Sequence, residues 1–321
     1  MISFTCNICG AANTAEEVPW EPPTCSGCRS NVRMRAIVHL LSAALFGAPR
    51  ALPDFPVNRK VKGIGLSDEH CYALPLARKF DYTNTFFDHD PFLDITAPHP
   101  ELYGSYDFIL SSDVFEHIAP PIERAFAEAF ALLKPNGILC ITVPSSAGDI
   151  DTTEYYPDLY MYSIIELGGE YFLINRKKNG SLEIHQNLEF HGGAGATLVM
   201  RQFSRGDLGR RLRAAGFSDV TFLSQNVESH GIVLAGPWGH PLLARKGPSN
   251  VLADTIRPRA KSPEAPLASI DPTPDEPALE LYKEKANLER RIVALGSQLL
   301  VISDSRWLKL GRRLGLGPKL R

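Results

Sequence analysis

The sequence has no long hydrophobic run and no leader-like N-terminus. A membrane-spanning helix needs roughly 18–20 consecutive apolar residues. The best run here, residues 36–47, is shorter and contains His39, so it predicts a buried amphipathic helix. Residues 1–6 lack the basic segment and apolar core of a signal peptide. We therefore expect the protein in the cytoplasm.

An excess of charge of either sign is also missing. The chain has 34 Lys and Arg against 36 Asp and Glu, a formal net charge of −2. No overall basic field would attract nucleic acid, which is therefore not an expected partner. Hydrophobic residues make up 44% and charged residues 22%, which excludes a wholly disordered or fibrous chain. With 321 residues, one large α/β domain with appendages is expected.

Cysteine is scarce, but four of the six cysteines form two pairs, Cys6 with Cys9 and Cys25 with Cys28, with fifteen residues between the pairs. Each pair can present two thiolates from a tight turn. In a reducing compartment such pairs indicate a metal before a disulfide. Four thiolates suit tetrahedral Zn²⁺ and leave no open position, so the sequence predicts a structural zinc site. Redox-active pairs are the alternative.

Other residues near and beyond these pairs have simpler interpretations. Arg29, Arg33 and Arg35 follow the second pair. We expect them on a solvated helix face, with contact to phosphate as the alternative. Cys71 and Cys140 stand alone in apolar surroundings and are expected in the core.

From residue 61 onward, short apolar segments alternate with amphipathic ones. This alternation predicts a Rossmann-like, doubly wound, mostly parallel sheet. A first helix is expected over 30–47. The expected strands are 61–66, 81–87, 106–112, 137–144 and 220–224, then 231–235, 241–244 or both, and the expected helices are 68–79, 121–133 and 204–215.

Composition divides the chain into four expected parts. Residues 1–48 are expected to form a zinc knuckle plus a helix, and residues 49–248 an α/β domain. An aromatic and polar insertion, 145–200, interrupts the strand and helix pattern of that domain. Residues 249–277 carry six prolines and predict a linker. Residues 278–321 are expected to form a coiled-coil helix and a basic tail.

The C-terminal part suggests two kinds of contact. Apolar residues within 278–302 step by three and four, a coiled-coil stripe that indicates self-association or a partner helix. Residues 305–321 hold six Lys and Arg and no acid, interleaved with Trp and Leu. This pattern predicts peripheral contact with an anionic membrane at the inner face. A disordered solubilising end is the alternative.

Two segments carry a family resemblance. Tyr106-Asp-Phe-Ile-Leu-Ser-Ser-Asp-Val-Phe-Glu-His-Ile is followed, after a predicted helix, by Leu132-Leu-Lys-Pro-Asn-Gly-Ile-Leu-Cys-Ile-Thr-Val-Pro. Together they resemble the fourth strand, next helix and fifth strand of class I S-adenosylmethionine (SAM) dependent methyltransferases. The resemblance implies that SAM lies across the carboxyl ends of the strands.

The same resemblance implies where the methionine part of SAM would lie. Glycines after the first strand let backbone approach that part of the cofactor, and the segment here contains Gly63, Gly65, Ser67 and Asp68. Ser67 stands where the family usually has a third glycine, and Val61 where it has an acid. Asp68 as the cap of the following helix is the alternative interpretation.

Further cofactor residues follow from the family pattern. Asn84 or Asp88 would hold the ribose hydroxyls, Asp94 would lie near the adenine amine, and Asp113 would face the methionine end. Asp94 and Asp113 as caps of turns are the alternatives.

Two histidines are candidates for the catalytic base. His117 follows the strand at 106–112, and His191 lies in the insertion beside two glycines. An imidazole with an ordinary pKa can take a proton from an acceptor hydroxyl near neutral pH. A histidine bonded to backbone is the alternative for each.

The leading hypothesis is a SAM-dependent methyltransferase with a structural Zn²⁺. Zinc-knuckle chains of this kind resemble enzymes of surface-polysaccharide assembly, which implies a sugar, polysaccharide or other small-molecule acceptor. One alternative is a methyltransferase-like scaffold without activity, because the glycine segment departs from the family pattern. A second alternative is an RNA or protein methyltransferase, with the knuckle and its arginines holding the substrate.

Overall fold

The computed structural model describes residues 1–147, 151–234 and 239–247. Its centre is a six-stranded sheet with the strand order β15-β16-β6-β5-β3-β4. Strands β4, β3, β5 and β6 are parallel, and β16 runs antiparallel to both β6 and β15. The expected α/β fold with a mostly parallel sheet is therefore confirmed. The strands are β3 (Asn58–Leu66), β4 (Phe80–Thr85), β5 (Tyr106–Ser112), β6 (Leu133–Thr142), β15 (Asp219–Phe222) and β16 (Leu242–Arg245).

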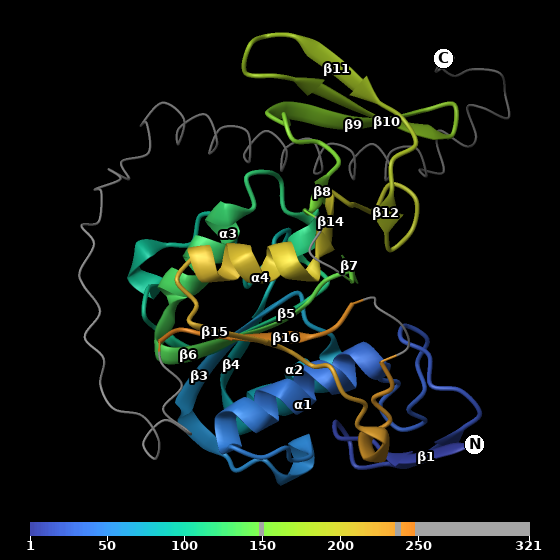
Figure 1. Cartoon of the computed structure of the whole chain (residues 1–321), viewed down its shortest axis with the longest axis vertical. Coiled ribbons are helices and arrows are strands. Elements are labelled where there is room, and N and C mark those ends of the chain that lie inside the picture. The colour runs from blue at the N-terminus through green and yellow to red at the C-terminus, as the bar shows by residue number, and fades with distance from the viewer. Residues whose placement is uncertain (148–150, 235–238, 248–321) are drawn as a thin grey trace, which may run out of the picture. The chain divides into compact units, whose positions relative to one another are not determined.

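Helices cover both faces of this sheet (Figure 1). Helices α1 and α2 pack on one face, where Phe108, Leu110 and Cys140 contribute to the core. Helices α3 and α4 pack on the other, where Ile109 and Leu139 contribute. Successive side chains of β5 and β6 thus alternate between two cores, which is why these strands are apolar throughout. The helices are α1 (Val32–Phe46), α2 (His70–Lys79), α3 (Glu123–Leu132) and α4 (Arg205–Ala214).

Local sequence signals define two of the helix starts. Asn31 caps α1 by accepting a hydrogen bond from the backbone N–H of Met34 at 3.0 Å. Ser204 caps α4 by accepting from the N–H of Asp207 at 3.1 Å. Such caps contribute about 1 kcal/mol each. Gly47 ends α1 in the left-handed conformation, with φ of 73°.

The N-terminal segment packs against the α/β core. Strands β1 (Ile2–Thr5) and β2 (Ala12–Ala15) form an antiparallel hairpin. Phe4 and Ile8 belong to the same buried cluster as α1 and Phe108 of β5. The N-terminal segment therefore shares its core with one face of the sheet.

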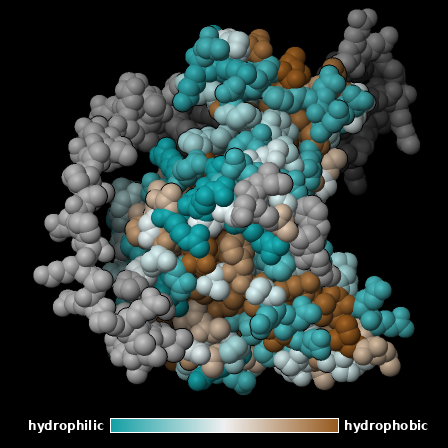
Figure 2. Space-filling model, viewed as in Figure 1, coloured by the Kyte–Doolittle hydropathy of each residue, from teal (hydrophilic) through white to brown (hydrophobic). Residues whose placement is uncertain are grey.

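The insertion at 145–200 forms β structure of its own. Strands β9 (Met161–Leu167), β10 (Glu170–Arg176) and β11 (Leu182–His185) make an antiparallel sheet (Figure 1). Hydrophobic atoms appear among hydrophilic ones at the top of the view in Figure 2, where this sheet lies. The smaller strands are β7 (Ser145–Ser146), β8 (Thr153–Glu154), β12 (Phe190–His191), β13 (Thr197–Leu198) and β14 (Arg201–Ser204), and the 3-10 turns are η1 (Leu52–Asp54), η2 (Pro100–Leu102), η3 (Phe115–His117) and η4 (Glu228–His230).

The last predicted strands agree with the structure in part, and the two isolated cysteines differ in burial. The predicted strand 241–244 corresponds to β16, which spans Leu242–Arg245. Within the predicted strand 231–235, of which residue 235 lies outside the described residues, Ile232 forms only an isolated bridge with Val227. Cys140 is buried, as expected, and Cys71 is half-buried against Met34.

No helix among the described residues is long and apolar enough to cross a membrane. The predicted linker 249–277, the coiled-coil stripe in 278–302 and the basic tail 305–321 all lie outside the described residues.

Candidate active site and cysteine cluster

Four thiols converge near the start of the chain, and we call Cys6, Cys9, Cys25 and Cys28 the cysteine cluster. The Sγ atoms of Cys6 and Cys28 are 3.7 Å apart and those of Cys9 and Cys25 are 3.6 Å apart. All four sulfur atoms lie within 4.8 Å of one another. Tetrahedral zinc with Zn–S bonds of about 2.3 Å separates its sulfur ligands by about 3.8 Å. The cluster therefore has the dimensions of a zinc site.

Polar donors surround these sulfur atoms. The backbone N–H of Ile8 donates to Cys6 Sγ at 3.4 Å, and Asn13 Nδ2 donates to Cys25 Sγ at 3.6 Å. Donors of this kind orient and stabilise thiolate ligands. Cys6 and Cys25 are buried, so a bound ion would be shielded from water on that side.

Helix α1 starts directly after the cysteine cluster, and its arginines point inward. Arg35 is fully buried and donates to the carbonyl oxygens of Ser30 and Gly231, both at 2.8 Å. Its guanidinium also lies over the ring of Phe4, 4.7 Å from the centroid. The expected solvated arginine face is therefore wrong for Arg35, because carbonyl oxygens and an aromatic ring replace water around its charge.

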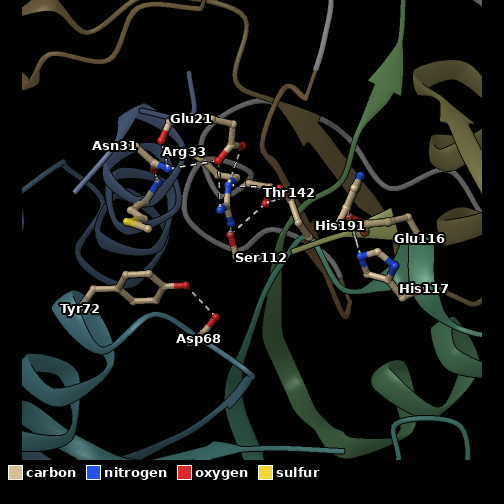
Figure 3. Close-up of polar contacts among 12 residues, drawn as sticks. Glu21, Asn31, Arg33, Asp68, Tyr72, Ser112, Glu116, His117, Thr142 and His191 are labelled. Atoms are coloured by element: carbon tan, nitrogen blue, oxygen red, sulfur yellow. Dashed lines mark hydrogen bonds and ion pairs between the residues drawn. The ribbon is translucent and has the colours of Figure 1, made fainter. Parts of the chain in front are cut away.

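Arg33 is the second arginine that the expectation misplaced, since its side chain is only 12% exposed. It reaches the carboxyl end of the sheet, where its Nη1 contacts Ser112 Oγ (Figure 3). Its Nε lies 3.1 Å from Asp113 Oδ2. The same Nε lies 3.1 Å from Glu21 Oε1. Of the three arginines, only Arg29 is exposed.

The ends of β3 and β5 meet at this edge with unusual backbone angles. The two strands are adjacent, with Leu66 paired to Ser111. The residues that follow them, Ser67 and Asp113, have φ of 55° and 54°. Left-handed conformations are uncommon for residues other than glycine and concentrate at functional sites. Both predicted cofactor residues thus lie at the carboxyl edge of neighbouring parallel strands.

Asp68 lies under this edge as a buried carboxyl group. Tyr72 OH donates to its Oδ1 at 2.7 Å and Tyr82 OH to its Oδ2 at 2.5 Å. Burial raises the pKa of Asp68 to about 6, and the two tyrosine hydrogen bonds oppose that rise. Its carboxyl is held by side chains, which is a different role from the simple cap of α2.

The two predicted glycines lie inside β3 and differ in their surroundings. A Cβ on Gly65 would lie 2.0 Å from Tyr82 OH and 2.3 Å from Asp68 Oδ2. A Cβ on Gly63 would lie 2.2 Å from the Phe108 ring, inside the core. Gly65 therefore leaves room for polar groups beside the strand end, while Gly63 allows an aromatic ring to pack on the sheet.

The predicted ribose and adenine residues lie along the same edge. Asn84 accepts from the backbone N–H of Asp68 and donates to its carbonyl, both at 2.8 Å, so it fixes the loop after β3. Asp88 is exposed in the turn beyond β4. Asp94 is buried, and its Oδ1 accepts hydrogen bonds from Thr96 N at 2.8 Å and Thr96 Oγ1 at 2.7 Å.

Beyond Asp113, the two predicted histidines come together with a carboxylate. We call Glu116, His117 and His191 the Glu-His-His cluster (Figure 3). His191 Nδ1 lies 3.2 Å from His117 Nε2 and 3.5 Å from Glu116 Oε1. His117 Nε2 lies 3.6 Å from the same carboxylate oxygen. Glu116 and His117 lie on η3, directly after β5, and the insertion brings in His191 on β12.

Burial and charge shift the pKa values in this cluster. Burial raises the pKa of Glu116 to about 7. Contact with the Glu116 carboxylate raises the pKa of His191, whereas burial lowers the pKa of His117. Three titratable groups whose pKa values are shifted by burial and by one another thus lie together beside the strand end that Asp113 marks.

A family comparison adds to this geometry. The profile of the family described as "Methyltransferase domain" matches residues 47–221, more than half of the chain. The chain belongs to this family. It is a SAM-dependent methyltransferase. The matched region begins after α1 and runs through β3, β4, β5 and β6 into β15. No curated protein matches the chain.

Solved methyltransferases resemble this one at low identity. One is 1,6-didemethyltoxoflavin-N1-methyltransferase from Burkholderia thailandensis, at 17% identity over 67% of this chain and 79% of that chain, with a TM-score of 0.38. Another is an amino pentose methyltransferase from Micromonospora echinaspora, at 13% identity over 68% of this chain and 92% of that chain, with a TM-score of 0.38.

Sequence reasoning missed two groups of this methyltransferase's site. Glu116 is not among the predicted site residues, although its place beside His117 after an apolar strand is a usable signal. Arg33 gave no signal, because its position three residues after Ser30 says nothing about contact with Ser112, 79 positions away.

Proposed function

We propose that this methyltransferase transfers the methyl group of SAM to a hydroxyl group of a sugar, polysaccharide or other small-molecule acceptor. The observation that carries the proposal is the Glu-His-His cluster beside Asp113, at the carboxyl edge where SAM is expected. Imidazole groups next to the reacting atoms can take a proton from a hydroxyl. Tyr155 and Phe190 are partly buried against the hydrophobic cluster of the insertion, and their rings are proposed to contact a sugar.

The cofactor would lie over the ends of β3, β4 and β5. SAM supplies the electrophilic sulfonium methyl group. Its amino-acid part carries one carboxylate and one ammonium group, and the Arg33–Asp113 pair offers one partner of each opposite sign. Gly65 lets Tyr82 and Asp68 pack beside the strand end, and Ser67, with φ of 55°, follows β3 at the edge where the cofactor would lie. Asp94 remains the proposed neighbour of adenine.

The protein's part in the reaction is alignment and proton transfer. Arg33 and Asp113 would hold the cofactor's amino-acid end, and either His191 or His117 would accept the acceptor's proton as its oxygen attacks the methyl group. His191 is the more accessible of the two, with 37% of its side chain exposed against 13% for His117.

The cysteine cluster would hold a structural Zn²⁺ ion. Four thiols at zinc spacing leave no position for a substrate. Because α1 begins within a few residues of Cys28, the ion would fix the helix that carries Arg33. We also propose that Arg35 serves this packing and not a nucleic-acid contact, since its guanidinium is buried.

Calorimetric titration of the zinc-loaded full chain with SAM, and with its demethylated product, tests the cofactor site. We expect stoichiometric binding that is lost in Gly65→Arg and weakened in Asp94→Ala, with Lys60→Ala, on the exposed start of β3, as the unaffected control. Release of S-adenosylhomocysteine is then screened with sugars and other hydroxyl compounds. A folded protein that binds no SAM would overturn the proposal in favour of a scaffold.

A further inference from the structure

The three ligand-type atoms of the Glu-His-His cluster form a nearly regular triangle. Its edges are 3.2 Å between His191 Nδ1 and His117 Nε2, 3.5 Å between His191 Nδ1 and Glu116 Oε1, and 3.6 Å between His117 Nε2 and Glu116 Oε1. A tetrahedral ion with bonds of about 2.1 Å to nitrogen and oxygen separates its ligands by about 3.4 Å. The triangle therefore has the size of one face of such a coordination shell.

The orientation of His117 suits a ligand. Its Nδ1 lies 2.8 Å from the carbonyl oxygen of Leu198. A carbonyl only accepts, so Nδ1 carries the proton, and the unprotonated Nε2 points to His191 Nδ1, which lies 3.2 Å away. Once His191 Nδ1 is unprotonated as well, both nitrogens present lone pairs to an ion between them. Metal-binding histidines commonly donate their second ring N–H to a backbone carbonyl in this way.

Glu116 supplies an independent observation. Its side chain is fully buried, and neither carboxylate oxygen has a hydrogen bond of normal geometry among the described residues. The two imidazoles, at 3.5 and 3.6 Å from Oε1, are the described groups that pair with it. A buried carboxylate is costly unless a cation or donor satisfies it, and a bound cation would do so fully. Oε1 faces the two imidazole nitrogens, which is where an ion would lie.

We propose that Glu116, His117 and His191 bind a divalent transition-metal ion such as Zn²⁺, with an open position for the acceptor oxygen. Two histidines and one glutamate with a free fourth position are the ligand set of catalytic zinc sites. His191 is partly exposed, so the open position faces solvent and incoming acceptor. The cysteine cluster differs, because four protein ligands would close it.

This inference deepens the proposed function and rests on it for the role of the ion. The acceptor hydroxyl binds the ion and loses its proton to water, because the ion stabilises the resulting alkoxide. The alkoxide oxygen then forms a bond to the methyl carbon of SAM, and the carbon–sulfur bond breaks with its electrons going to sulfur. In this arrangement both imidazoles are ligands, and the ion takes over the activation of the hydroxyl.

Co²⁺ titration of the full chain, with its cysteine cluster already loaded with Zn²⁺, tests the site. Calorimetry gives the stoichiometry, and the absorption spectrum identifies the ligands, because thiolate ligands add charge-transfer bands that nitrogen and oxygen ligands lack. We expect one Co²⁺ per chain without thiolate bands. Glu116→Gln and His191→Ala should weaken this binding by at least about 100-fold. His185→Ala, on β11 of the same insertion, is the matched control and should bind as the wild type does.

Binding of SAM by each variant shows that it is folded. A wild-type protein that binds SAM but takes up no Co²⁺ outside the cysteine cluster overturns the metal site and leaves the proposed function standing. Variants that bind Co²⁺ as tightly as the wild type also overturn it. Co²⁺ bound at this site without any SAM binding supports the site and overturns the proposed function.

Discussion

The cysteine cluster and the Glu-His-His cluster are built in opposite ways. The first takes all its ligands from residues 6–28, uses four thiols and has a closed set. The second joins η3 to His191, 74 positions after His117, uses mixed ligands and has a partly exposed side. A closed, local set suits a structural ion, whereas an open, long-range set suits chemistry on a substrate.

The difference between the clusters also concerns what each supports. The cysteine cluster precedes α1 and shares its buried core with Phe4 and Phe108. The Glu-His-His cluster lies where the insertion meets the sheet edge, and Glu116 there faces the two imidazoles without a hydrogen bond of normal geometry among the described residues. We therefore expect changes in the first cluster to act on folding and changes in the second to act on catalysis.

Cys25→Ser is expected to have the largest effect. Structural zinc supplies about 10–16 kcal/mol of apparent binding free energy in small zinc domains, and Cys25 is buried in the cluster. We expect loss of zinc, a lower melting temperature and loss of SAM affinity as Arg33 is released. Atomic emission, circular dichroism melting and calorimetry measure the three. Cys71→Ser, outside the cluster, should retain its zinc; a zinc-free Cys25→Ser that melts and binds SAM like the wild type would contradict the expectation.

Glu116→Gln should separate catalysis from stability. We expect kcat to fall by about 10²–10⁴-fold, because the activation of the acceptor hydroxyl is lost. In protein prepared without an ion in this cluster the melting temperature should not fall, because glutamine keeps the shape of the side chain and the change removes a buried charge. Initial rates with an acceptor from the hydroxyl screen, and thermal melts, check both parts. His185→Ala is the control. If Glu116→Gln lowers the melting temperature as well as kcat, the expected difference between the two clusters is wrong.

Asp68 is a buried carboxyl group outside both clusters, and tyrosine hydroxyls hold it in place of an ion. Burial raises its pKa from 3.8 in the unfolded chain to about 6 in the folded protein. The folded state therefore holds the proton more tightly, and stability decreases as pH rises from about 4 to 6. The loss is about 3 kcal/mol. Urea unfolding of wild type and Asp68→Asn at several pH values should show this difference, and parallel pH profiles would refute it.

Arg33→Met should give the smallest of these effects. Arg33 lies on α1, directly after the cysteine cluster, and contacts Asp113 at the sheet edge near the Glu-His-His cluster. Hydrogen bonds to charged groups contribute about 1.5–3 kcal/mol, so we expect the Kd for SAM to rise by about 10- to 100-fold with zinc content unchanged. Arg29→Met is the matched control, since that side chain is exposed. Calorimetry decides, and an unchanged Kd would show that the cofactor's carboxylate binds elsewhere.

Much of the fold could be predicted because its signals are local. The apolar runs at 106–112 and 137–144 correspond to strands buried on both faces, β5 and β6. Ser204 caps α4 as its position predicts. The sheet within 145–200 could not be predicted, because β9 is exposed along most of its length and lacks the alternation of a half-buried strand.

The sequence alone determined the cysteine cluster, the α/β pattern and the methyltransferase segment after β5, because short spacings and apolar periodicity act within one element or turn. The tertiary structure decided that Arg33 lies inside the sheet edge and that His191 meets Glu116 and His117. These contacts depend on how α1 and the insertion pack on the sheet. Packing follows from the burial of many side chains together, which no local pattern records.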